Sequence, residues 1–266
     1  MRLDRLLVER GFAPSRQRAK ELILQGQVII EGKQITKPSA DVPCGAKTEV
    51  LGAPLAYPSR AGLKLEKALK VFGIHVQGKA ALDVGASTGG FTSCLLQAGA
   101  RLVMAVDVGQ DQLVDELRCD SRVRVYEKTN IRDLTPEQLP ELADLAVIDV
   151  SFISLAKVFP AVQSLITSEA EVVALMKPQF ETGGEGLNKH GVIQDMNIHK
   201  KYLPPLINQL QGDNFGLLGF DFSPIAGTKG NIEYLAHFRL GSRPLDAAGL
   251  VTSVIMSAWR GRKGGL

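Results

Sequence analysis

Four charged residues that lie far apart in the chain have the types needed for proton transfer. Asp149 and Lys177 each end an apolar segment typical of a buried strand, Lys64 lies in a helical segment ahead of them, and Glu233 follows them. A lysine that closes an apolar strand needs a charged partner if it is buried. A lysine amine can act as a base only where burial or a second cation disfavours its charged form. The pattern therefore indicates an amine base that a second lysine and two carboxylates hold in place.

A glycine-rich turn forms a second candidate site. The segment Asp83-Val84-Gly85-Ala86-Ser87-Thr88-Gly89-Gly90 leaves an apolar strand and enters a helix. Its glycines let the backbone approach a ligand closely, although the spacing does not match the G-x-G-x-x-G dinucleotide pattern. Asp107 ends the next strand, where ribose hydroxyls can donate to it, and Asn130 follows the third strand, where it can read an adenine edge. This combination resembles an S-adenosylmethionine site.

The same turn also fits a different class of enzyme. Residues 85–89 satisfy the G-x-S-x-G elbow of α/β-hydrolases, and Ser87, Asp149 and His237 follow one another in the order of that triad. The elbow, however, normally follows several strands of the same sheet, whereas only about twenty residues separate this turn from the proline-rich break before it. The triad also leaves both lysines without a role, so a hydrolase is the less favoured reading.

The elements that position these residues begin near residue 79, where apolar strands alternate with helical segments. Strands are expected over 79–84, 102–107, 123–126, 145–149 and 172–177, helices over 154–165 and 196–210, and a late β-rich run over 231–238. This alternation is typical of an α/β fold, a doubly wound and mostly parallel Rossmann-like sheet. Ligands bind at the carboxyl ends of the strands in such sheets. The candidate residues are therefore expected at one edge.

The first sixty residues have a different pattern, that of a small α+β module. Leu3, Leu6 and Leu7 predict a first helix, and Ser15 is placed to cap a second helix that Gly26 closes. Short strands are expected at 28–33 and 48–51.

These patterns predict four regions. They are a small N-terminal domain over 1–52, a linker over 53–60, a catalytic domain over 61–242 and a C-terminal helix with a basic tail over 243–266.

The N-terminal module resembles the S4 RNA-binding domain. The matching residues are Arg2-Leu3-Asp4, Gly11, Ser15-Arg16, Ala19, Ile23, Gly26, Val28, Gly32 and Pro38. Charge supports a polyanionic partner, because residues 1–60 carry a net charge of +4 and residues 241–266 one of +3, against −4 between them. The candidate RNA contacts are Arg5, Arg16, Arg18 and Lys20.

The four charged residues resemble the Lys-Asp-Lys-Glu tetrad of FtsJ-like 2′-O-ribose methyltransferases. Together with the S4-like start, residues 2 to about 240 resemble the TlyA, or hemolysin A, family of rRNA methyltransferases. The resemblance implies methyl transfer from S-adenosylmethionine to a ribose 2′-hydroxyl of ribosomal RNA, within a subunit or its precursor. The start at the S4-like pattern favours the shorter form of the family, which acts on the large subunit.

The resemblance also assigns residues by their type and place. It implies catalytic roles for Lys64, Asp149, Lys177 and Glu233. It places Gly85, Ser87 and Gly89 at the methionine side of the cofactor, Asp107 at its ribose, and Asn130 or Asp133 near its adenine, and it counts Asp83 among the cofactor-binding residues.

The composition of the chain limits the classes of protein to which it can belong. The chain of 266 residues is 45% hydrophobic, has no apolar run long enough for a transmembrane helix, and begins without a secretory signal pattern. Its three cysteines are spaced as neither a disulfide framework nor a metal site. A cytoplasmic protein is therefore expected, with no metal, no membrane contact and no obligate protein partner.

Two further alternatives stay open. One is a non-catalytic RNA-binding or ribosome assembly factor that retains a vestigial cofactor pocket. The other is a membrane-lytic protein, for which the weakly amphipathic segment 247–259 is the one candidate helix. That segment is expected to pack on the sheet instead.

Overall fold

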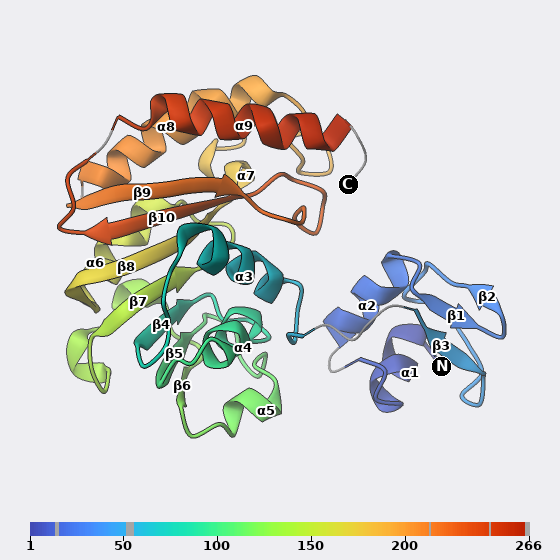
Figure 1. Ribbon diagram of the computed structural model, residues 1–266. Coiled ribbons are helices and arrows are strands. Elements are labelled where there is room, and N and C mark those ends of the chain that lie inside the picture. The colour runs from blue at the N-terminus through green and yellow to red at the C-terminus, as the bar shows by residue number, and fades with distance from the viewer. Residues whose placement is uncertain (14–15, 52–55, 213, 245, 264–266) are drawn as a thin grey trace. The chain divides into compact units, whose positions relative to one another are not determined.

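Two separate hydrophobic cores divide the chain into two units, Met1–Arg60 and Ala61–Leu266. The computed structural model, drawn in Figure 1, describes residues 1–13, 16–51, 56–212, 214–244 and 246–263. The predicted helix cap at Ser15 and residues 53–55 of the predicted linker lie outside these ranges.

The first unit packs two helices on a small antiparallel sheet. Its elements are α1 (Leu3–Glu9), α2 (Arg16–Leu24), β1 (Val28–Ile30), β2 (Lys33–Gln34) and β3 (Thr48–Val50), with the strand order β2-β1-β3. The apolar faces of both helices are buried against β1. Glu31 and Gly32 both have positive φ, the backbone conformation that joins two strands through a tight hairpin turn.

A buried carboxylate ties the start of this unit together. Asp4 lies in α1 with no solvent exposure. It accepts hydrogen bonds from Arg2 at 3.0 and 3.1 Å and from Arg16 of α2 at 2.9 Å. The two guanidinium groups hold the pKa of Asp4 far below its usual range, although burial opposes them. The charge of Asp4 is therefore matched inside the domain.

The second unit is built on a seven-stranded sheet with the order β6-β5-β4-β7-β8-β10-β9. The strands are β4 (Ala80–Val84), β5 (Leu102–Val106), β6 (Val123–Tyr126), β7 (Ala143–Ile148), β8 (Ile166–Met176), β9 (Phe215–Phe222) and β10 (Tyr234–Leu240). The pairs from β6 to β8 are parallel, while β10 runs antiparallel to both β8 and β9. The reversal at β10 brings the segment before it to the carboxyl edge of β8.

Helices cover both faces of this sheet (Figure 1). They are α3 (Ala61–Phe72), α4 (Gly90–Gln97), α5 (Asp115–Arg118), α6 (Phe159–Ser164), α7 (Pro178–Glu181), α8 (Met196–Gly212) and α9 (Ala248–Lys263), with short 3-10 turns at Ile131–Asp133, Pro136–Gln138 and Leu155–Lys157. Helices α6, α8 and α9 share a core with alternate residues of the strands, so α3 and α4, which pack on each other, cover the opposite face. Val251 and Ile255 of α9 are fully buried in that core.

Three elements differ from their predicted form. The helix expected over 154–165 is a 3-10 turn followed by α6, because Pro160 starts a new helix at its first turn. The strand expected at 172–177 begins already at Ile166. Strand β9 was not predicted, since its two glycines weaken the strand pattern. One of them, Gly219, has a structural reason, because a Cβ there would lie 2.6 Å from the Phe72 ring of α3.

The contacts of Asp4 with Arg2 and Arg16, the Asp4 cluster, should stabilise the first unit. Asp4→Asn keeps the shape of the side chain but removes its charge, so we expect the first unit to lose about 1–3 kcal/mol at pH 7. Amide hydrogen exchange over α1 and α2 in the full chain measures this loss. In the wild-type protein the same contribution is present above the unfolded pKa of about 4 and disappears as the pH falls below it, because the folded pKa is lowered. Unchanged exchange in the variant would show that the cluster adds nothing.

Candidate active site

The carboxyl edge of the central strands brings Asp149, Lys177 and Glu233 together. Asp149 follows β7 and Lys177 follows β8, and these strands are neighbours. Lys177 Nζ lies 2.6 Å from Asp149 Oδ1. Because Tyr234 pairs with Met176 in the antiparallel ladder, Glu233 stands opposite Lys177 one position beyond it. Glu233 thus precedes β10 rather than lying within the predicted late strand.

Lys64 completes this group from a helix. It lies in α3, and its Nζ is 2.6 Å from Glu233 Oε2. Lys64, Lys177 and Glu233 are 4–9% exposed. A buried ion of either sign is costly unless an opposite charge is in contact with it, and here each lysine has its own carboxylate. The structure therefore assembles the four sequence-predicted residues as two ion pairs, which we call the paired tetrad.

The loop after β7 contributes residues that the sequence analysis did not single out. Ser151 accepts a hydrogen bond from Lys177 Nζ at 3.0 Å. The next residue, Phe152, has φ of +64°, a conformation that costs a bulky residue energy, and its side chain is 89% exposed. Its ring lies 4.9 Å from that of Phe180, the third residue after Lys177. An aromatic ring is thus held in solvent beside the paired tetrad, and in the sequence only its place three residues after Asp149 could have revealed it.

Glu181 fixes that loop to the segment after β8. One carboxylate oxygen of Glu181 accepts a hydrogen bond from the backbone N–H of Leu155 at 3.0 Å. Burial raises the pKa of Glu181, which the hydrogen bonds from Ser154 and Leu155 oppose. The 149–155 loop and the segment after β8 are therefore joined at two points, at Glu181 and at Lys177.

The glycine-rich turn contacts the tetrad through its backbone. Gly85 has φ of +88°, and a Cβ on it would lie 2.5 Å from the carbonyl oxygen of Asp149. Only glycine permits so close an approach between the turn after β4 and the end of β7. Gly89, with φ of +94°, begins α4, where a Cβ would lie 2.2 Å from Leu117. The turn and the candidate catalytic residues are therefore one rigid edge.

Asp107 is oriented by the same turn. Its two carboxylate oxygens accept hydrogen bonds from the backbone N–H groups of Ser87 at 2.8 Å and of Gly109 at 2.7 Å. Each oxygen keeps a further lone pair for the hydroxyl of a ligand. Ser87 itself is exposed and has φ of +47°. This arrangement suits a ribose bound along the edge of β4 and β5.

Asp83, under the turn, is the most unusual titratable group. It is fully buried in β4, where Thr92 Oγ1 donates to one of its oxygens at 2.6 Å. The other oxygen is buried and has no hydrogen-bond partner among the described residues. Burial raises the pKa of Asp83 to about 7, Thr92 opposes the shift, and the nearby charge of Asp149 adds to it. A cationic ligand bound at the turn would relieve that cost, so the residues present fit the cofactor that the sequence suggests.

The two residues expected near adenine lie beyond Asp107. The side-chain oxygen of Asn130 accepts from the backbone N–H of Arg132 at 3.1 Å and so caps the 3-10 turn that contains Asp133. The backbone N–H of Thr129 donates to the Asp107 carbonyl at 3.0 Å, which brings this segment to the cofactor side of the edge. Asp133 is exposed. The segment that carries both residues is therefore joined to Asp107 through its backbone.

The candidate RNA contacts in the first unit differ in exposure. Arg5 is exposed and pairs with Glu9 at 2.6 Å, and Arg16 is exposed although it donates to Asp4. Lys20 is half-buried. Arg18 is 7% exposed and lies 3.3 Å from Glu21, so its guanidinium is largely covered, and burial lowers its pKa. Arg5 and Arg16 are the most accessible of the four.

The hydrolase triad is not assembled. Ser87 Oγ lies 3.2 Å from Gln112, and Asp149 is paired with Lys177. His237, in β10 opposite Val173, has its Nε2 3.1 Å from Glu171. Since the three residues bond to other partners, the hydrolase reading is wrong.

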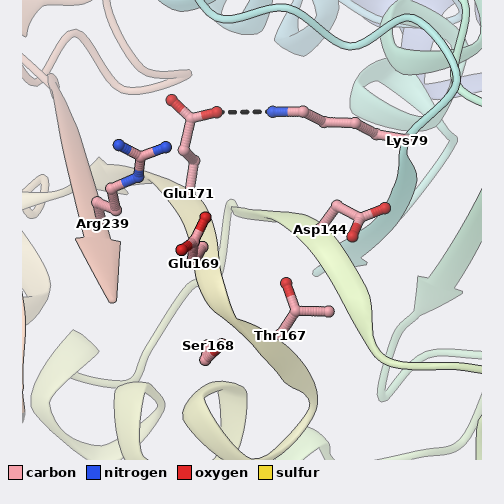
Figure 2. Close-up of a pocket in the computed structure, with 7 residues that line it drawn as sticks. All are labelled: Lys79, Asp144, Thr167, Ser168, Glu169, Glu171 and Arg239. Carbon is pink, nitrogen blue, oxygen red and sulfur yellow. Dashed lines mark hydrogen bonds and ion pairs between the residues drawn. The ribbon is translucent and has the colours of Figure 1, made fainter. Parts of the chain in front are cut away.

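A pocket lies at the opposite end of the sheet, and none of the paired tetrad lines it. It is lined by Lys79, Asp144, Thr167, Ser168, Glu169, Glu171 and Arg239. Figure 2 shows Lys79 and Glu171 pointing toward one another, with 2.6 Å between Nζ and Oε2. These residues stand where β4, β7 and β8 begin, and Glu171 already contacts Lys79 and His237. The pocket therefore lies at the amino edge of the sheet, and its Lys79 and Glu171 side chains are already paired with each other.

Neither a membrane-spanning helix nor a metal-binding cluster is found among the described residues. No helix in them combines the length and apolar character needed to cross a bilayer. Nor do they contain three or more His, Cys, Asp or Glu side chains gathered so that they could hold a metal ion.

Known proteins share both units. Residues 57–240 match the FtsJ-like methyltransferase family, and residues 1–45 match the S4 domain. The 16S/23S rRNA (cytidine-2′-O)-methyltransferase TlyA of Mycobacterium tuberculosis is 44% identical over 255 residues, 95% of each chain. Hemolysin A of Brachyspira hyodysenteriae is 43% identical over 239 residues, 90% of this chain and 99% of that protein. A solved structure of a hemolysin-named protein from Streptococcus thermophilus has a TM-score of 0.82 at 41% identity and covers 99% of this chain and 97% of that one.

The buried Asp83 predicts a pH dependence of stability. Between the unfolded pKa of about 4 and the folded pKa of about 7, only the folded state holds the proton, so stability falls as the pH rises. We expect wild type to lose up to about 1.4 kcal/mol per pH unit from pH 5 to 7 relative to Asp83→Asn. Urea unfolding followed by the fluorescence of Trp259, the single tryptophan, measures both proteins. Equal pH slopes in the two would contradict the assignment.

Proposed function

The chain belongs to the FtsJ-like methyltransferase family, and from this premise we propose that it methylates a ribose 2′-hydroxyl of ribosomal RNA with S-adenosylmethionine. The observation that carries the proposal is the paired tetrad at the carboxyl edge of the sheet, next to the glycine-rich turn. Large-subunit RNA is the target we favour and small-subunit RNA the second, and the name of the M. tuberculosis relative includes both.

The cofactor would be held along β4 and β5. Asp107 would accept from its ribose hydroxyls, Asn130 and Asp133 would lie near its adenine, and the turn from Gly85 to Gly89 would face its methionine part. The buried carboxylate of Asp83 would balance its positive charge. When bound, S-adenosylmethionine supplies a methyl group that is already electrophilic.

The paired tetrad then has to prepare a weak nucleophile. A ribose hydroxyl must be aligned with the methyl group and must lose its proton during or near attack. In our proposal Lys177 receives that proton at Nζ as the neutral amine, or stabilises as the ammonium the negative charge that develops on the oxygen. Asp149 holds Lys177 in place at 2.6 Å, and Glu233 holds Lys64 as the second cation. Ser151 steadies the Lys177 ammonium from the loop.

The first unit would supply affinity for the RNA. Proteins that recognise structured RNA do so largely through phosphates, 2′-hydroxyls and shape. The match to the S4 domain and the accessible guanidinium groups of Arg5 and Arg16 support this role. Arg18, being covered, would act through the packing of α2, and Lys20 would add a partly accessible charge.

Phe152 offers an aromatic ring on which a nucleobase of the RNA can stack. A nucleotide whose ribose enters the edge of the sheet must leave its helix, and an unstacked base is stabilised by an aromatic ring. Phe152 presents its ring to solvent one residue after Ser151, and Phe180 supports it. We infer that Phe152 stacks on the target base or its neighbour.

Removing the proposed base tests the function. Lys177→Ala should lower kcat for methyl transfer to RNA by about 100- to 10,000-fold while the affinity for S-adenosylmethionine stays within a few fold. The assay uses methyl-labelled S-adenosylmethionine with purified 50S and 30S subunits from cells that lack this protein. Lys70→Ala, at an exposed lysine in α3, is the matched control. Retained turnover in Lys177→Ala would overturn its role, and cofactor binding without transfer by wild type would favour an earlier assembly precursor. If wild type bound no cofactor, the non-catalytic assembly factor would lead.

The role of Phe152 is tested separately. We expect Phe152→Ala to lower kcat/KM for RNA by about 5- to 100-fold, the value of one stacked base. The melting temperature and cofactor affinity should not change, because the side chain is almost wholly exposed. Phe152→Tyr keeps a ring at the same backbone conformation and should stay near wild type. Equal loss in both variants would point to backbone strain rather than stacking.

A further inference from the structure

A buried asparagine joins two loops next to Glu233. Asn231 is 3% exposed. Its side-chain oxygen accepts from the backbone N–H of Ile193 at 3.0 Å, and its Nδ2 donates to the carbonyl of Gly191 at 2.9 Å. The glycine-rich stretch after α7 is thereby fixed to the segment that leads into β10. We call residues 187–193 and 227–231 together the double loop.

The tip of the double loop is held in one shape by its own hydrogen bonds. The side-chain oxygen of Asn188 accepts from the backbone N–H groups of His190 at 2.9 Å and Val192 at 3.0 Å. The Asn188 N–H in turn donates to the Val192 carbonyl at 3.0 Å. Lys189, at this tip, is exposed. Its backbone is ordered in advance, so binding there would cost little conformational entropy.

Lys229 adds a second cation from the other half of the double loop. It is exposed, and a Cβ built on Gly191 would lie 3.4 Å from its Nζ, so the lysine crosses the tip. The acids nearby are engaged elsewhere, because Glu185 lies 2.8 Å from Lys201 and contacts Tyr202, and Asp195 accepts from Asn197. Within the described ranges, neither Lys189 nor Lys229 forms an ion pair.

The double loop is continuous with the paired tetrad. The backbone N–H of Gly227 donates to the carbonyl of Asn231 at 2.9 Å. A Cβ on Gly227 would lie 2.4 Å from Glu233 Oε1, so this turn covers the carboxylate that holds Lys64. One residue, Ile232, separates the anchor Asn231 from Glu233. A ligand bound by Lys189 and Lys229 would therefore lie at a fixed distance from the paired tetrad.

We propose that the double loop binds backbone phosphates of the RNA beside the target ribose, through Lys189 and Lys229. The proposal rests on the proposed function and adds a second RNA contact that sets the position of the ribose. Two cations without carboxylate partners among the described residues attract a polyanion, and loops fixed by Asn231 would hold the bound RNA in one alignment. An uncharged or basic partner would leave both ammonium groups unmatched.

Salt dependence tests this proposal. Two phosphate contacts contribute about 1.4 to 1.8 to the slope of log affinity against log salt concentration. The double variant Lys189→Gln/Lys229→Gln should therefore bind 50S or 30S subunits about tenfold more weakly near physiological salt, with a slope shallower by that amount. KM for the subunit should rise to match, while kcat, cofactor affinity and melting temperature stay near wild type.

Lys70→Gln is the matched control, because it neutralises an exposed lysine at the end of α3, away from the carboxyl edge. It should keep the wild-type slope. The inference is wrong if the double variant binds the subunits with unchanged affinity and slope. Subunit binding is measured apart from methyl transfer, so a wild-type protein that binds without methylating would count against the proposed function alone. A wild type that bound neither subunit would overturn both.

Discussion

Burial of two ammonium groups at one edge of the sheet is the constraint from which the rest of the second unit follows. Lys177 and Lys64 each need a carboxylate in contact, since an unpaired ion in that environment is costly. Asp149 can reach Lys177 because β7 and β8 are parallel neighbours. Glu233 can reach Lys64 because β10 runs back antiparallel to β8 and so begins at the same edge. The reversal of direction at β10 is thus what unites the four residues.

The two halves of the site depend on each other through close backbone contacts rather than through side chains alone. Gly85 touches the carbonyl of Asp149, and Gly227 lies against the carboxylate of Glu233. A larger residue at either place would separate the cofactor-side turn, or the loop before β10, from the paired tetrad. The geometry that would align a hydroxyl with a methyl group is therefore built into positions with no side chain of their own.

Most strands could be predicted from the sequence, the structure brings the four tetrad residues together, and the family models confirm the FtsJ-like and S4 resemblances. The residues at strand ends could be found because parallel strands place their carboxyl ends at one edge. Other features have no local pattern. The Asn231 anchor spans two loops that are distant in sequence, Arg18 is covered by packing that composition does not show, and β9 carries glycines that suit a neighbouring ring. Phe152 can be recognised as a candidate site residue only from its exposed side chain and its positive φ, which the structure supplies.

The atom that receives the methyl group tests the central claim most directly. Ribosomal RNA incubated with the protein and labelled S-adenosylmethionine can be digested to nucleosides and examined by mass spectrometry, with alkaline hydrolysis of the same RNA alongside. The paired tetrad predicts a nucleoside methylated on its ribose, together with one internucleotide bond that resists alkali, because the 2′-oxygen is blocked. A methyl group on a base, with every bond cleaved by alkali, would contradict the assignment of Lys177 and its partners to a ribose hydroxyl.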